Sequence, residues 1–116
     1  MYRVTKRMAV AGAHALVLDY PSKCSKLHGH NWIIMVVCES EELNSNGMVV
    51  DFSKIKEIVS VLDHECISTA IQQADDLKFH FQATAENIAK WICEHVPYCV
   101  EVRVQESEGN EACYIK

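Results

Sequence analysis

Two histidines stand at the start of an apolar segment, and that position fixes how they point. His28 and His30 flank Gly29, and the run Trp32-Ile-Ile-Met-Val-Val-Cys38 follows. Runs rich in β-branched and apolar residues are typical of strands, so the pair is expected to open one. Alternate side chains of a strand share a face. The sequence therefore places His28 and His30 on the same side of a sheet.

His14 supplies a third imidazole. It ends an earlier strand-like segment, residues 2–14, and an antiparallel pairing would bring it beside the pair. Three neutral imidazoles with one open position are typical ligands of catalytic zinc. Cys24 is then either a fourth ligand of a closed structural site or an unligated reactive thiol beside the metal. The alternative to a metal site is a set of ordinary polar residues on a strand.

Composition limits the classes of protein to consider. With 116 residues we expect a single domain, 1–116. The net charge of -5 argues against a nucleic-acid partner, which would need a basic surface. No apolar run reaches the length of a membrane span, and the N-terminus lacks an apolar signal-peptide core. We therefore expect a cytoplasmic protein without a membrane partner, whose six cysteines are mostly reduced and buried.

The remaining pattern predicts four strands and two helices in the order ββααββ. Strands are expected over residues 2–14, 28–39, 98–106 and 111–116. The first helix is capped by Asp51 or Ser53, and its apolar stripe consists of Ile55, Ile58, Val59 and Leu62. The second helix begins after Thr84 and ends before Pro97. Residues 67–82 are ambiguous, with a short helical turn followed by a loop as the expectation.

The second strand is apolar on both faces beyond its histidines. Ile34 and Val36 lie on one face, and Ile33 and Met35 on the other. An antiparallel strand with one face in water should alternate, so both faces should be covered. Helices can cover one face, and another subunit or a closed barrel must cover the other. We therefore predict an oligomer.

Two further positions are candidates for chemistry. Asp63 can orient His64 as a proton donor or acceptor near neutral pH, although a polar helix end is the alternative. Glu106 ends the apolar strand face formed by Val100, Val102 and Val104. A carboxylate there needs a cation of the fold or a ligand as its partner, unless the strand ends at the solvent boundary. It could accept two parallel N–H bonds from the edge of a pterin or guanine.

In this order the motifs resemble the 6-pyruvoyl-tetrahydropterin synthase and 6-carboxy-tetrahydropterin synthase family. The matching motifs span nearly the whole chain: Ala13-His14, Cys24-x3-His28-Gly-His30, Met48-Val-Val-Asp51-Phe52, Leu62-Asp63-His64, Thr84-Ala-Glu86-Asn87-Ile-Ala and Val104-Gln-Glu106-Ser. The three-residue gap between Cys24 and His28 is associated with the bacterial 6-carboxy branch. The product of that branch feeds the synthesis of queuosine and other 7-deazapurines.

The resemblance implies an activity and roles for these residues. The zinc ion would be held by His14, His28 and His30. The substrate would be 7,8-dihydroneopterin triphosphate, converted to 6-carboxy-5,6,7,8-tetrahydropterin with loss of triphosphate and acetaldehyde. Cys24 would take a proton as thiolate, and His64, oriented by Asp63, would be the partner acid and base. Glu106 would anchor the pterin edge.

The resemblance also implies an α+β tunnelling fold. In this fold a four-stranded antiparallel sheet carries two helices on one face, and sheets of several subunits join into a β-barrel, usually in a homohexamer of two trimers. Active sites in the family lie between subunits. Cys24 and the Asp63-His64 pair would then come from different chains.

The chain departs from the family pattern at several positions. Many members have a basic residue where this chain has Ala15 and an aromatic residue where it has Val10, and Asn-Pro-Thr is usual in place of Gln82-Ala83-Thr84. The candidates to bind the triphosphate are Lys6, Lys23 and Lys26. Three alternatives stay open: a 6-pyruvoyl-tetrahydropterin synthase, a non-catalytic zinc- or pterin-binding module, and another tunnelling-fold activity on GTP or a purine.

Overall fold

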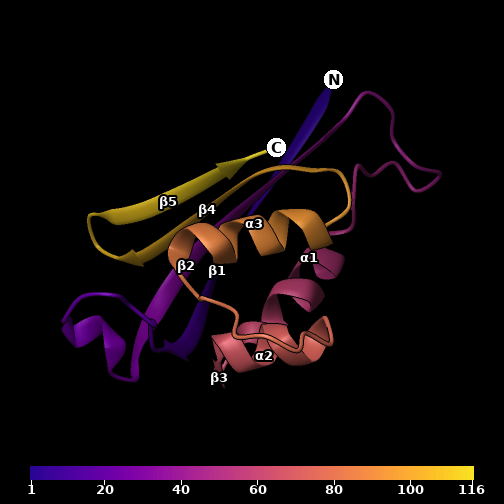
Figure 1. The fold of residues 1–116 in the computed structure, drawn as a ribbon. Helices are drawn as coiled ribbons and strands as arrows, with labels where there is room; N and C mark the ends of the chain where they lie inside the picture. The colour runs from indigo at the N-terminus through magenta and orange to yellow at the C-terminus, as the bar shows by residue number, and fades with distance from the viewer.

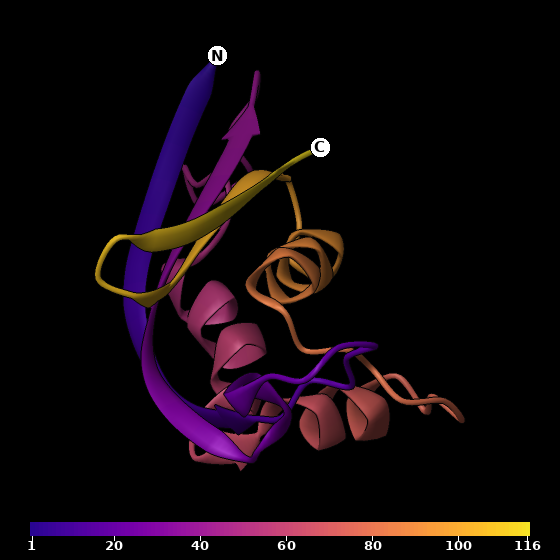
Figure 2. The same cartoon turned by 60° about the vertical axis from the view of Figure 1, so that its left-hand side comes forward.

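The computed structural model describes residues 1–116, in which one twisted sheet carries all the helices on one face (Figures 1 and 2). The strands are β1 (Tyr2–His14), β2 (His28–Ser40), β3 (Glu65–Cys66), β4 (Cys99–Ser107) and β5 (Asn110–Ile115). The helices are α1 (Phe52–Val59), α2 (Ile67–Ala74) and α3 (Ala85–His95). The strand order in the sheet is β3-β1-β2-β4-β5. Only the short β1–β3 pairing is parallel.

The expectation of a four-stranded antiparallel sheet with two helices therefore lacks two elements of the observed fold. β3 adds a fifth, parallel strand of two residues, and α2 adds a third helix of eight residues within the ambiguous segment. The N-cap residue of α2 is Cys66, whose side chain makes no capping hydrogen bond. The sequence thus lacked the usual sign of a helix start. The helix forms because Ile67 and Ile71, one turn apart, are buried in the core.

The other two helices begin at the caps that the sequence indicated. Asp51 Oδ1 accepts a hydrogen bond from the Ser53 amide at 2.8 Å, and Thr84 Oγ1 accepts one from the Asn87 amide at 3.1 Å. α1 ends at Val59, and a 3₁₀ turn over Ser60–Leu62 continues the apolar stripe to Leu62. None of the helices combines the length and the hydropathy that a membrane crossing requires.

The core lies between the helices and the even-numbered face of the sheet. The buried side chains that the strands contribute to it include Val10, Trp32, Ile34, Val36, Val102 and Val104. The opposite face of β2 carries Ile33 and Met35, which are only half-buried in the single chain. This exposure is what an oligomer would remove, and the oligomer itself stays a prediction.

The cysteines are all free thiols, and their burial varies. Cys38, Cys93 and Cys99 are buried as expected, and burial raises the pKa of Cys93 to about 12. These thiols act as small apolar core residues. The expectation is wrong for Cys113, which is exposed because its strand, β5, lies at the edge of the sheet.

Gly12 is predicted to be intolerant of a larger side chain. A Cβ at this position would lie 2.8 Å from Ile67 Cδ1 and 2.9 Å from Ile67 Cγ1, so Ile67, which is 1% exposed and packed in the core, would have to shift. We expect Gly12→Ala to lower the free energy of unfolding by about 1–3 kcal/mol, the usual range for overpacking. Chemical denaturation of the metal-free protein measures this.

Gly29→Ala is the matched control, because its added Cβ would meet only the Gly12 carbonyl oxygen at 3.6 Å, an ordinary contact. An equal loss of stability in both variants would contradict the steric argument.

Candidate metal centre

The pairing of β1 with β2 brings three imidazoles together. His14 lies directly opposite His28, and Gly12 lies opposite His30. The ring centroids are 4.6 Å apart for His14 and His28, 4.9 Å for His28 and His30, and 5.2 Å for His14 and His30. The antiparallel pairing that the sequence analysis expected between the two strands is thus present, and it places the three rings on one face.

Backbone carbonyls fix the orientation of two of these rings. His14 Nδ1 lies 2.7 Å from the Ala83 carbonyl oxygen, and His28 Nδ1 lies 2.6 Å from the Lys26 carbonyl oxygen. A carbonyl only accepts, so each Nδ1 carries a proton, and in the neutral ring Nε2 is then the nitrogen with the free lone pair. A hydrogen bond from the other ring nitrogen to a backbone carbonyl is typical of histidines that bind metals.

The free nitrogens point into a shared, buried space. His14 Nε2 and His30 Nε2 are both buried, and neither has a partner in hydrogen-bond geometry, although the Glu106 carboxylate lies close to both. Buried polar atoms without partners are rare in proteins because they are costly. Burial also lowers the pKa of His30, which favours its neutral, metal-binding form. The two nitrogens therefore have the properties expected of ligand atoms.

Glu106 is a fourth member of this cluster. Its Oε1 lies 3.2 Å from His14 Nε2 and 2.9 Å from His30 Nε2. The ligand atoms of Glu106 and the three histidines all lie within 4.8 Å of one another. Glu106 stands on β4 where its pairing with β5 shifts register, and such bulges often re-aim a side chain at a functional site.

The sequence analysis identified Glu106 as a candidate functional residue but did not predict that it lies beside the histidines. The signal was present, because Glu106 lies on the same face of β4 as Val102 and Val104, which pack in the core beside β2. Its expected role as a pterin anchor stays a prediction. The structure adds a second possible role, that of a metal ligand.

The four donors fit a divalent transition metal. Three imidazole nitrogens with a carboxylate or an open position are a common donor set for catalytic zinc.

Cys24 does not belong to this donor set. It lies in a 3₁₀ turn, Lys23–Ser25, which Ser22 caps by accepting a hydrogen bond from the Cys24 amide at 3.1 Å. The thiol is half-buried. Of the two roles that spacing left open for Cys24, the arrangement supports the unligated thiol.

Asp63 and His64 are not joined as a dyad in the single chain. His64 Nε2 and Asp63 Oδ2 are 3.8 Å apart, too far for a hydrogen bond. Asp63 Oδ1 instead accepts from the Ala11 amide at 2.9 Å, and the His64 amide donates to the Ala11 carbonyl at 2.6 Å. His64 adopts a positive φ of 59°, and 82% of its side chain is exposed. The backbone thus holds His64 in an uncommon conformation that presents its ring to solvent.

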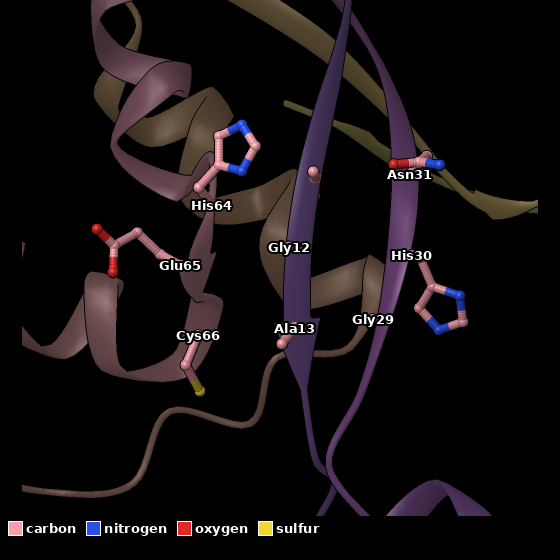
Figure 3. A pocket seen from close by; sticks show the side chains of 9 residues that line it. Gly12, Ala13, Gly29, His30, Asn31, His64, Glu65 and Cys66 are labelled. Carbon is pink, nitrogen blue, oxygen red and sulfur yellow. The ribbon is translucent and has the colours of Figure 1, made fainter.

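His64 also lies apart from the metal ligands of its own chain. It lines an open pocket of about 550 Å³, to which β1 and β2 contribute Ala11, Gly12, Ala13, Gly29, His30 and Asn31. The odd-numbered side chains of this set lie on the face opposite the histidine cluster, whereas His30 is itself a member of that cluster. In Figure 3 the ribbon of β1 runs between His64 and His30. One chain therefore does not bring His64 to its own cluster.

The three candidate lysines differ in position. Lys23 and Lys26 are exposed on either side of Cys24. Lys6 is half-buried, with its ammonium 6.0 Å from the centre of the Phe52 ring. Lys23 and Lys26 are thus the two that accompany the thiol.

The chain is thus an α+β protein with a mixed five-stranded sheet, three helices on one face, and three histidines and a glutamate gathered across its strands. The sequence model of the 6-pyruvoyl tetrahydropterin synthase family matches residues 3–116, and the chain belongs to that family. The resemblance seen in the sequence is therefore confirmed.

Individual relatives agree with this assignment. The chain is 27% identical to a 6-carboxy-5,6,7,8-tetrahydropterin synthase of Bacillus subtilis, over 97% of this chain and 84% of the relative. It is 33% identical to a dihydroneopterin monophosphate aldolase of Pyrococcus furiosus, over 94% of this chain and 91% of the relative. The structure of Caenorhabditis elegans 6-pyruvoyl tetrahydropterin synthase aligns with 99% of this chain and 95% of its own, with a TM-score of 0.73 at 23% identity. That likeness supports the fold.

Glu106→Gln separates the two roles of Glu106. If the carboxylate is a ligand, its replacement should weaken zinc binding, with no pterin present, by at least the roughly 10- to 100-fold that follows loss of a group hydrogen-bonded to a ligand. Competition with a chromophoric chelator measures the affinity. His14→Ala, which removes a ligand, should weaken binding at least as much, and His64→Ala should leave it unchanged. Unaltered zinc affinity in Glu106→Gln would show that Glu106 is not a ligand.

Proposed function

We propose that the chain is a zinc-dependent lyase that converts 7,8-dihydroneopterin triphosphate to 6-carboxy-5,6,7,8-tetrahydropterin, with loss of triphosphate and acetaldehyde. The observation that carries this proposal is the cluster of three histidines and Glu106, in which the buried Nε2 atoms of His14 and His30 have no partner in hydrogen-bond geometry. The three-residue gap between Cys24 and His28 favours the 6-carboxy branch, as does the Bacillus subtilis relative. The product would enter queuosine and 7-deazapurine synthesis in the cytoplasm.

Zinc held by His14, His28 and His30 would polarise the substrate hydroxyls as a Lewis acid and so acidify the neighbouring bonds. The Ala83 carbonyl keeps the imidazole of His14 in the tautomer that offers Nε2. Cys24, half-buried and outside the donor set, is free to take a proton from the substrate side chain. Glu106 lies where its carboxylate can hold either the metal or the pterin edge.

The partner acid and base would come from a second copy of the chain. His64 is exposed and faces away from its own cluster, so it is available to a neighbouring subunit. The half-buried outer face of β2, with Ile33 and Met35, is apolar surface that such assembly would cover. We propose a homohexamer whose sheets join into a β-barrel, with Asp63 orienting His64 at each site between subunits.

A second candidate function is an aldolase acting on dihydroneopterin monophosphate. The Pyrococcus furiosus relative of that name shares 33% identity with this chain, more than the 27% of the Bacillus subtilis synthase. An aldolase would break a carbon–carbon bond without releasing triphosphate, so the substrate and products distinguish the two. A 6-pyruvoyl-tetrahydropterin synthase would release triphosphate but keep the whole side chain.

The deciding experiment is product analysis. The zinc-loaded protein is incubated separately with the triphosphate and the monophosphate of 7,8-dihydroneopterin, and the products are identified by mass. Acetaldehyde, inorganic triphosphate and the 6-carboxy product in equal amounts are expected. A 6-pyruvoyl product, or turnover of the monophosphate alone, would overturn the 6-carboxy assignment. No turnover of either would favour a binding module.

Mixing two inactive variants tests the site between subunits. We expect Cys24→Ala and His64→Ala each to retain zinc and to lose nearly all turnover. Hexamers re-formed from an equal mixture should regain activity in about a quarter of their sites, because Cys24 and His64 then come from intact parts of different chains. Sites built within one chain would show no recovery. Loss of zinc from Cys24→Ala would instead indicate that the thiol is a ligand.

A further inference from the structure

The loop over residues 15–27, which carries Cys24, has little apolar burial to hold it. No residue of its 3₁₀ turn is buried. Its large apolar side chains are mostly exposed: Val17 by 70%, Leu27 by 68% and Tyr20 by 61%. A segment with so few buried contacts depends on hydrogen bonds for its order.

Gln82 supplies two of these hydrogen bonds from outside the loop. Its Oε1 accepts from the Val17 amide at 3.0 Å, and its Nε2 donates to the Val17 carbonyl at 2.7 Å. The side-chain amide thus pairs with both polar groups of one backbone residue, as a neighbouring strand would. In Figure 2 the loop over residues 15–27 and the segment that leads into α3 lie beside each other at the lower right.

Gln82 is itself fixed from several sides. Its carbonyl accepts from Asn87 Nδ2 at 2.9 Å and from the Thr84 amide at 2.9 Å, which ties it to the start of α3. His80 Nε2 lies 3.3 Å from Gln82 Oε1. Next to this histidine, the Phe81 carbonyl accepts from the buried Ser68 hydroxyl of α2 at 2.5 Å. The amide therefore projects from a segment anchored to two helices.

The connection reaches both parts of the site. The Leu16 amide, next to Val17, donates to the Cys24 carbonyl at 3.0 Å. The Ala83 carbonyl, next to Gln82, accepts from the imidazole of His14. The side chain of Gln82 thus binds the loop that carries Cys24, and the neighbouring backbone carbonyl of Ala83 binds the imidazole of His14.

We propose that Gln82 is a positioning residue that holds the loop carrying Cys24 in register with the metal centre. The inference rests on the proposed function only for the role of Cys24. An amide is required at this position, because Val17 offers both a donor and an acceptor. A carboxylate would face the Val17 carbonyl without a proton to donate, and an aliphatic side chain would leave both groups unpaired.

The test uses the full-length, zinc-loaded protein with Gln82→Leu, Gln82→Glu and the control Gln73→Leu. Gln73 is an exposed glutamine on α2. Three quantities are measured: amide hydrogen exchange over residues 15–27, the rate of Cys24 alkylation by iodoacetamide followed by peptide mass, and bound zinc. Kinetics with the substrate found by product analysis follow.

We expect Gln82→Leu to speed exchange at Val17 and alkylation of Cys24 by about 10-fold, since two hydrogen bonds are lost. The value of kcat should fall by a similar factor with KM nearly unchanged, and zinc content should stay at the wild-type level. Gln82→Glu keeps the acceptor, so its exchange and alkylation rates should fall between those of wild type and Gln82→Leu. Gln73→Leu should match wild type.

Three outcomes would overturn the proposal: wild-type exchange and alkylation rates in Gln82→Leu, equal effects in Gln73→Leu, or a fall in kcat that follows loss of zinc. Exchange and alkylation need no pterin. If the wild-type protein turned over no pterin, the proposed function would fail, while these two rates would still decide whether Gln82 holds the loop.

Discussion

The antiparallel register of β1 on β2 is the constraint on which the metal centre depends. It sets His14 opposite His28 and Gly12 opposite His30, and so gathers three imidazoles on the helix-covered face. Because side chains alternate, a slip of one residue would turn the histidines of one strand to the other face. The buried Trp32 opposes such a slip, since its indole N–H donates to the Gly12 carbonyl at 3.0 Å.

The centre combines groups that are costly to bury with few internal partners. His14 is 1% exposed, yet its Nε2 lacks a hydrogen bond. Its Nδ1 is fully committed to the Ala83 carbonyl, so the ring has one orientation and one free lone pair. Such a polar atom is destabilising in the apo chain, and a bound metal would repay that cost with a coordinate bond. A metal bound between them would likewise account for the Glu106 carboxylate oxygen lying 3.2 Å and 2.9 Å from the Nε2 atoms of His14 and His30.

The two faces of the sheet have different tasks. The even-numbered face packs on the helices and holds the histidine cluster, whereas β1 runs between His30 of that cluster and His64 (Figure 3). A single chain therefore separates groups that the proposed chemistry needs together. His64 has a positive φ, its amide donates to the Ala11 carbonyl, and its exposed ring would be accessible to a second copy in the proposed assembly.

The sequence by itself determined four of the five strands, two capped helices, the shared face of His28 and His30, and the family, because alternation, capping and motif order are local properties of the chain. It missed the two-residue strand β3, and it missed α2, whose start has no capping side chain and whose stability comes from burying Ile67 and Ile71. Only the tertiary structure decided that Glu106 joins the histidines, that Cys24 does not, and that Gln82 holds the Val17 backbone. Those contacts join residues far apart in the chain, and their distances follow from how the sheet and loops pack.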